Sequence, residues 1–211
     1  MKYFQFNFST KPEETGMTFP QVQTSRDLIP VNDPRHIRGK GFEFLHDVYV
    51  PEAIVHPDAK PSDLLSVVFT SRLGISAKLK MLLEENTEEG LFQFLPMTVH
   101  YLDKTYEYWL LNPLRFDMQT INFEKSEAWL CGAGDTKVKK LSIGSQNDFE
   151  KLSKAVFLPE RINIYSVKFK DNIQKDFIIL RNAPGIRYYV SEILKQKIET
   201  AGLTGISFEV L

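Results

Sequence analysis

The stretch LFQFLPMTVHYLDKTYEYWLL, residues 91–111, decides the fold that we predict from the sequence. Residues 91–99 and 106–111 are rich in aromatic and branched apolar side chains, and a polar turn with Asp103 and Lys104 separates them. Two such runs on either side of a short polar turn are typical of an antiparallel β-hairpin. We therefore expect two adjacent antiparallel strands in the middle of the chain.

A change of hydrophobic period precedes this hairpin. Leu79, Leu82 and Leu83 fall at positions i, i+3 and i+4, which is the spacing of one face of an α-helix. Ser76 stands before them and can cap the helix, because a serine hydroxyl can accept a hydrogen bond from an amide of the first turn. The pattern predicts an amphipathic helix that ends before Gly90.

Strand and helix patterns continue on both sides. A second helix is expected after Ser191, with Leu194, Ile198 and Ala201 on its buried face, and a short third helix at 148–156. Further strands are expected at residues 1–7, 42–50, 64–69, 162–169, 177–180, 188–190 and 206–211.

These elements predict the fold class. Patterns that can form hairpins outnumber those that need a crossover, so we predict an α+β fold with a mainly antiparallel sheet and two or three helices. Prolines and glycines are dense between residues 12 and 41, which favours irregular structure in the N-terminal third. We expect a single domain over residues 1–211, in which residues 1–62 form an irregular part with strands and residues 63–211 form the core.

Two segments of the chain resemble each other. The first carries Ile75-Ser76, Leu79-Lys80, Leu83-Glu84 and Gly90-Leu91, and the second carries Val190-Ser191, Leu194-Lys195, Ile198-Glu199 and Gly205-Ile206 at the same spacing. This similarity indicates either a duplicated strand–helix–strand element or the ordinary likeness of capped helices that lie between strands.

Charge limits the classes of partner. The chain has 26 Lys and Arg against 27 Asp and Glu, a net charge of −1, whereas nucleic-acid binders usually carry a basic excess or a basic stripe. Lys137, Lys139 and Lys140 form a basic group in a strand-like stretch, where lysines usually make a solvated face. We expect no nucleic-acid partner.

Cysteine usage and hydropathy bear on location. Cys131 is the only cysteine, which excludes a disulfide within the chain and favours a reducing compartment. The first eight residues alternate polar and aromatic side chains and lack the apolar stretch of a signal peptide. No window approaches the roughly 18 consecutive apolar residues of a membrane span. We expect a soluble, cytoplasmic protein with no membrane partner.

The histidines do not match the pattern of a metal or catalytic site. They are His36, His46, His56 and His100. The first three lie ten residues apart with no cysteine near them, which differs from the ligand spacing of a zinc site. Glu43 and His46 would lie on opposite faces of the strand expected at 42–50, because side chains alternate along a strand.

Cys131 and the glycines after it also have structural interpretations. Residues 129–132 (WLCG) are typical of the end of a buried strand, where a cysteine is usually inert. Residues 132–135 (GAGD) lack the third glycine of a dinucleotide fingerprint and the Lys-Ser/Thr of a P-loop. We expect no catalytic residue, no cofactor and no metal.

Four acids at the end of the first helix are the candidates for partner binding. Glu84, Glu85, Glu88 and Glu89 cluster where that helix ends. The cluster is either the solvated terminus of a helix or an acidic patch for a basic partner, since such patches raise the rate of encounter.

A series of short motifs follows Asp63 and covers about two thirds of the chain. The motifs are 75–80 (ISAKLK), 92–96 (FQFLP), 108–112 (YWLLN) with Asp117 after it, 177–180 (FIIL), 190–195 (VSEILK) and 201–208 (AGLTGISF). In order and spacing they resemble a large family of bacterial immunity proteins, the eleventh in the polymorphic-toxin classification, formerly a domain of unknown function.

The resemblance implies a protein without catalytic residues that binds a cognate toxin stoichiometrically and so protects the cell that makes it. Two other classes fit the residues. One is a small-molecule hydrolase or transferase that uses scattered acids and histidines, with a pocket that collects Glu43, His46 and His100. The other is a structural or regulatory subunit of another assembly.

Overall fold

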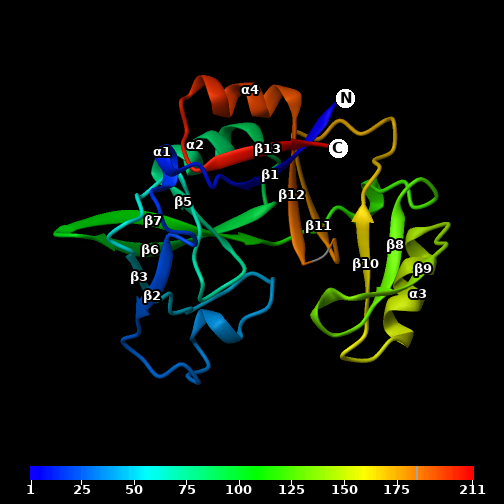
Figure 1. Ribbon diagram of the computed structural model, residues 1–211, viewed down its shortest axis with the longest axis horizontal. Helices are drawn as coiled ribbons and strands as arrows, with labels where there is room; N and C mark the ends of the chain where they lie inside the picture. The colour runs from blue at the N-terminus through cyan, green and yellow to red at the C-terminus, as the bar shows by residue number, and fades with distance from the viewer. Residues whose placement is uncertain (184) are drawn as a thin grey trace. The chain divides into compact units, whose positions relative to one another are not determined.

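The computed structural model describes residues 1–183 and 185–211 and has the predicted α+β fold with mainly antiparallel sheets (Figure 1). The strands are β1 (Tyr3–Phe8), β2 (Val22–Arg26), β3 (Glu52–Val55), β4 (Leu64–Leu65), β5 (Leu73–Ser76), β6 (Phe92–Tyr101), β7 (Lys104–Pro113), β8 (Glu127–Cys131), β9 (Lys137–Leu141), β10 (Arg161–Ser166), β11 (Phe177–Arg181), β12 (Ile186–Ser191) and β13 (Ile206–Val210). The helices are α1 (Pro12–Thr15), α2 (Ala77–Asn86), α3 (Gln146–Ala155) and α4 (Glu192–Thr200), with 3-10 turns η1 (Ile37–Gly39), η2 (Met118–Thr120) and η3 (Ala133–Asp135).

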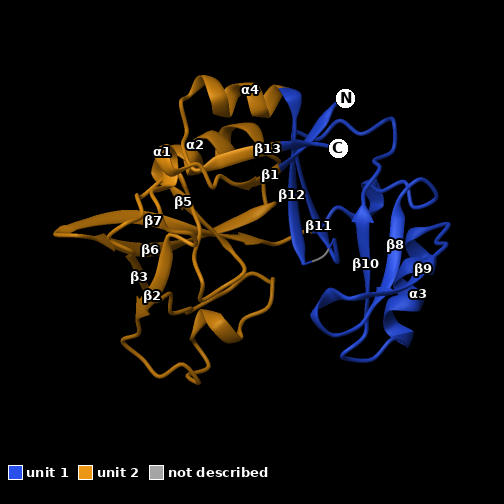
Figure 2. Ribbon diagram, viewed as in Figure 1, with its two compact units in different colours: residues 1–5, 116–192, 209–211 blue, residues 6–115, 193–208 orange. Residues whose placement is uncertain are grey.

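The chain divides into two compact units (Figure 2). Unit 1 is made of residues 1–5, 116–192 and 209–211, and unit 2 is made of residues 6–115 and 193–208. Strands β1 and β13 therefore contribute residues to both units. Neither unit coincides with the expected N-terminal part or core, and the single domain stays a prediction.

Unit 2 is built on the predicted hairpin, which the structure confirms. β6 and β7 pair antiparallel from Phe92 opposite Pro113 to Tyr101 opposite Lys104. They lie inside a six-stranded sheet of order β2-β3-β6-β7-β5-β4, in which β3 and β6 run parallel and the other pairs antiparallel. Because side chains alternate along a strand, every second residue of β6 enters the core of this unit.

Helix α2 begins where the sequence predicts. The Ser76 hydroxyl accepts a hydrogen bond from the Leu79 amide at 3.2 Å, which satisfies one of the amides that the first turn leaves unpaired. Leu79 and Leu83 are fully buried, and the helix packs on β5 and β7.

Unit 1 has a core rich in aromatic rings. β8 pairs antiparallel with β9 and β10, and α3 packs against β10. β11 pairs antiparallel with β12, beside which the sheet continues to β1 and β13. The ring of Phe169 lies between those of Tyr3 and Tyr189, with centroids 5.0 and 5.3 Å away in edge-on contacts. Burial of such rings contributes strongly to a core of this size.

The two similar segments share an aspartate–serine contact at the start of the helix. Before α2, Ser76 donates its N–H to the Asp63 carbonyl at 2.9 Å and its hydroxyl to the Asp63 carboxylate at 2.6 Å. Before α4, Ser191 donates its N–H to the Asp176 carbonyl at 2.9 Å, and its hydroxyl bonds the Asp176 carboxylate. Each aspartate directly precedes the strand that pairs with the one before the helix.

The likeness extends into the helices. Lys80 pairs with Glu84 at 2.6 Å, and Lys195 pairs with Glu199 at 2.7 Å, one turn later in each case. Each ammonium also lies over a phenylalanine ring of the following strand, at 5.2 Å from the centroid of Phe94 and 5.4 Å from that of Phe208, although these two residues are one position apart in the alignment of the segments. These shared contacts favour a duplicated hairpin–helix–strand element over the ordinary likeness of capped helices.

The strand predicted at residues 42–50 is wrong. Only Tyr49 makes a bridge in this part of the described chain, Asp47 has a φ of +44°, and the regular strand is β3, which begins at Glu52. Glu43 and His46 therefore do not lie on opposite faces of a strand. The apolar alternation in this stretch comes from a loop whose side chains only partly enter the core.

Three polar side chains bind the backbone groups of this loop, which a neighbouring strand would bind if the loop were a strand. The Gln93 amide accepts from the Leu45 N–H at 2.9 Å and donates to the Leu45 carbonyl at 2.7 Å. Asn112 donates to the Glu43 carbonyl at 2.9 Å, and Arg72 donates to the carbonyl groups of the two residues before Phe42 and to Asn112. Since Arg72 and Asn112 are almost fully buried, these bonds fix the backbone of the loop.

Two further differences have local causes. The strand predicted at 64–69 is limited to β4, because the Ser66 N–H turns toward the Gln21 side chain at 3.1 Å. Strand β2 was not expected from the sequence, and its pairing with β3 is irregular between Val22 and Thr24. Such a bulge interrupts the two-residue period that marks a strand in the sequence.

Candidate functional site

The residues that could form a hydrolytic pocket have separate partners. Nε2 of His100 on β6 is hydrogen-bonded to Glu52 on β3 at 2.9 Å. The ring of His46 packs on Phe44, with centroids 4.9 Å apart. Glu43 contributes its backbone carbonyl to the contacts that hold the loop. Each therefore belongs to a different set of contacts.

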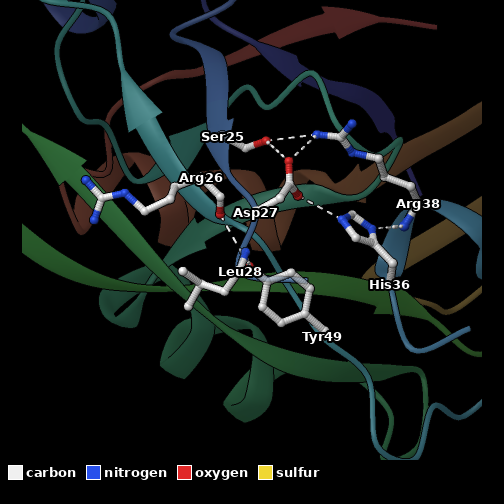
Figure 3. Close-up of polar contacts among 7 residues, drawn as sticks. All are labelled: Ser25, Arg26, Asp27, Leu28, His36, Arg38 and Tyr49. Carbon is white, nitrogen blue, oxygen red and sulfur yellow. Dashed lines mark hydrogen bonds and ion pairs between the residues drawn. The ribbon is translucent and has the colours of Figure 1, made fainter. Parts of the chain in front are cut away.

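A polar cluster that the sequence analysis did not identify joins the end of β2 to the loop after it (Figure 3). The Asp27 carboxylate is at its centre: Oδ1 lies 2.8 Å from Nε2 of His36, and Oδ2 lies 3.3 Å from the Arg38 guanidinium. The Ser25 hydroxyl accepts from Arg38 at 2.8 Å and donates to Asp27 at 3.4 Å. The His36 side chain is fully buried, whereas Asp27 and Arg38 are partly exposed.

The cluster does not have the geometry of a Ser-His-Asp triad. Nδ1 of His36 accepts the N–H of Arg38 at 3.2 Å, so the ring proton is on Nε2, which donates to Asp27. With both nitrogens in use, the ring has no lone pair left for the Ser25 proton. In a triad the histidine lies between serine and aspartate, whereas here the aspartate lies between the other two.

Tyr49 extends the cluster as a structural clamp. Its hydroxyl accepts from the Leu28 N–H at 2.6 Å and donates to the Arg26 carbonyl at 3.3 Å, as Figure 3 shows. Its ring packs edge-on against His36, with centroids 5.5 Å apart. The cluster thus fixes the course of the loop between β2 and β3.

A turn just before His36 is closed by an ion pair. The Arg35 guanidinium and N–H both bond the Asp33 carboxylate and hold the pKa of Asp33 at about 2. The His36 N–H donates to the Asp33 carbonyl at 2.9 Å. The carboxylate therefore keeps its charge, and with it the ion pair that closes the turn, even below the ordinary pKa of an aspartate.

The described residues contain no group of three His, Cys, Asp or Glu side chains placed to hold a metal ion. Cys131 is buried, and its Sγ lies 3.6 Å from the Trp129 carbonyl and 3.7 Å from the Tyr165 hydroxyl. These contacts describe a thiol packed at the end of β8.

The structure separates the four glutamates that the sequence analysis identified as partner-binding candidates. Glu84, Glu88 and Glu89 line a groove of about 380 Å³ together with Phe92 and Phe94 of β6. Glu85 lines a second hollow instead, next to Lys78 and Lys197. All four glutamates are exposed. The groove adds two aromatic side chains that the sequence analysis did not connect with the acids.

The groove is acidic and can accept a cation. Glu84 pairs with Lys80, and Glu88 pairs with Arg115. The Glu88–Arg115 pair is open to solvent and the Lys80–Glu84 pair is partly so, and exposed pairs contribute little to stability, so a cation from a partner can replace them. The Lys80 ammonium lies over the Phe94 ring as well, which is how an aromatic face attracts a positive charge.

Comparison with protein-family models identifies the relatives of the chain. The model of the Immunity protein family (Imm11) matches residues 3–211. The chain belongs to the Imm11 immunity protein family. The match to Imm11 covers essentially the whole chain and includes the N-terminal third, where the sequence motifs are absent. Neither a curated protein nor a solved structure matches the chain.

None of the helices in the described part of this Imm11 protein has the length and apolar character needed to cross a bilayer.

Substitutions in the polar cluster test whether His36 stabilises the fold as a structural clamp. We expect His36→Ala to lower the free energy of unfolding by about 2–4 kcal/mol, because it empties a buried site and leaves Asp27 without its main donor. Ser25→Ala should cost less than about 1 kcal/mol, since Ser25 is partly exposed. Urea denaturation measures both, with His56→Ala at a half-exposed histidine as the control. A larger loss for Ser25→Ala than for His36→Ala would contradict the clamp.

Proposed function

We propose that this protein binds a cognate bacterial toxin in a stoichiometric complex and neutralises it in the cytoplasm of the cell that makes both. The observation that carries this proposal is the match of the Imm11 immunity family to residues 3–211. An immunity role requires a surface complementary to the toxin and no chemistry of its own. Occlusion or distortion of the toxin's active site is the mechanism that such a complex uses.

The arrangement of polar residues supports binding rather than catalysis. Both ring nitrogens of His36 are engaged, and so are those of His100, which contacts Glu52 through Nε2 at 2.9 Å and the Thr105 hydroxyl through Nδ1 at 3.3 Å. A general base needs a free lone pair within reach of the proton that it removes. The hydrolase and the regulatory subunit considered above have no comparable observation in their favour.

We further propose that the acidic groove contacts the toxin. Glu84, Glu88 and Glu89 would face Lys or Arg side chains of the toxin, and Phe92 and Phe94 would contact their aliphatic parts. Exposed charges of this kind mainly steer the encounter and set the partner, whereas buried anchors contribute most of the affinity. Glu85 would act only through the long-range field, because it lines another hollow.

Co-expression tests the proposed function directly. A toxin-like reading frame next to the gene for this protein should arrest growth when expressed alone, and expression of this protein should restore growth. Purified, the two proteins should form a complex that elutes as one species. If growth stays arrested despite equal expression, the immunity role is rejected.

Charge reversal tests the acidic groove. Changing Glu84, Glu85, Glu88 and Glu89 to Lys should weaken toxin binding at least tenfold at low salt, and the difference should shrink as salt screens the charges. The matched control reverses Glu124, Glu150, Glu160 and Glu209, which are exposed acids in unit 1 with the same total change of charge. Equal affinities of the two variants, measured by calorimetry at two salt concentrations, would reject the groove as the contact.

A further inference from the structure

The tip of the β6–β7 hairpin is a projecting part of unit 2. In Figure 1 the two strands run together beyond the other strands of this unit and end in a narrow tip. Tyr101 pairs with Lys104, so the turn between them has only two residues, Leu102 and Asp103. Such a convex tip can enter a concave surface of another molecule.

The backbone conformation at the tip is unfavourable for the residue that occupies it, Leu102. Leu102 has a φ of +52°. Asp103, the second residue of the turn, does not have a positive φ. When only the first residue of a two-residue hairpin turn has a positive φ, glycine is strongly favoured there, because a side chain crowds the backbone. A leucine here therefore reduces the stability of the turn.

Leu102 differs from the other residues that have a positive φ. Among the described residues other than glycine, φ is positive at Asp47, Leu102, Asp135 and Asn182. Three of these are Asp or Asn, whose short polar side chains tolerate the conformation. Leu102 is the only one of these four residues with an apolar side chain.

Burial does not compensate for the strain. Leu102 is 70% exposed, whereas the leucines of the adjacent strands, such as Leu95 and Leu110, are buried. An apolar side chain that is strained and also solvated contributes nothing to the folded state of the isolated protein. Strain that the fold itself does not require points to a function at that position.

The hairpin holds the tip firmly. Pairing between β6 and β7 continues to the last residues before the turn. Tyr101 and Tyr106 at its base pack against the core of unit 2, and His100 bonds both Thr105 and Glu52. Leu102 is therefore presented on a preorganised support, which lowers the entropy that binding would cost.

We propose that Leu102 is an anchor that inserts into an apolar pocket on the surface of the toxin. This inference rests on the proposed immunity function. The polar residues around the tip, Asp103, Lys104 and Thr105, are exposed and would form the solvated rim of the contact. The partner surface is therefore concave and apolar at its centre, in contrast to the basic surface that fits the acidic groove.

The test uses the opposite effects that Leu102→Asn should have on folding and on binding. Asparagine tolerates the left-handed backbone, so the melting temperature of the free protein should stay equal or rise. Affinity for the toxin, measured by calorimetry with a catalytically inactive toxin, should fall at least tenfold. Leu102→Met keeps an apolar side chain and should retain most of the affinity. Leu28→Asn, at a leucine of unit 2 that is 67% exposed, is the matched control and should leave affinity unchanged.

Each outcome decides the question. Affinity that Leu102→Asn leaves unchanged, while the wild-type protein binds, overturns the anchor but not the immunity function. A loss that Leu28→Asn shares also overturns it, since apolar exposure in general would then be responsible. If sedimentation shows that the wild type dimerises and Leu102→Asn does not, the tip serves self-association instead. A wild type that does not bind the toxin at all rejects the proposed function and the anchor together.

Discussion

The hydrogen bonds of Arg72, Gln93 and Asn112 to the loop before β3 are the constraint on which unit 2 depends. The loop has little regular structure, yet its carbonyl and amide groups are satisfied by side chains that belong to the sheet region. Loss of one partner would leave buried polar groups unpaired, which costs more than a typical hydrogen bond contributes. Gln93 and Asn112 belong to the short motifs FQFLP and YWLLN, so the apolar core motifs also carry the polar contacts that fix the loop.

The sequence was sufficient for the elements whose causes are local. The hairpin, the Ser76 cap and the helix after Ser191 follow from residues within a few positions of one another, and the structure confirms them. The strand predicted at 42–50 failed because its pairing was decided by side chains such as Gln93, almost fifty residues away. The same limit applies to the duplicated element: its helices were visible in the sequence, but the contacts of Asp63 and Asp176 were not.

The candidate site was predictable only in part. Clustering along the sequence identified the acids at the end of α2, but the fold decides which of them share a groove with Phe92 and Phe94. Asp27 and His36 lie nine residues apart in an irregular segment, with no period to connect them. The strain at Leu102 depends on a backbone angle that composition does not reveal. In each case the missing information was the path of the backbone through space, while the residue types themselves were already informative.

A protein that neutralises a toxin through its surface alone must do so by binding, and a stoichiometric titration tests this most directly. Purified toxin is mixed with increasing amounts of the protein, and the remaining toxin activity is measured after short and long incubations. Binding predicts a linear decrease that reaches zero at a fixed molar ratio and does not change with time. Complete inactivation by a small fraction of an equivalent, which grows with incubation time and is abolished by changing one acid or histidine, would contradict a binding mechanism.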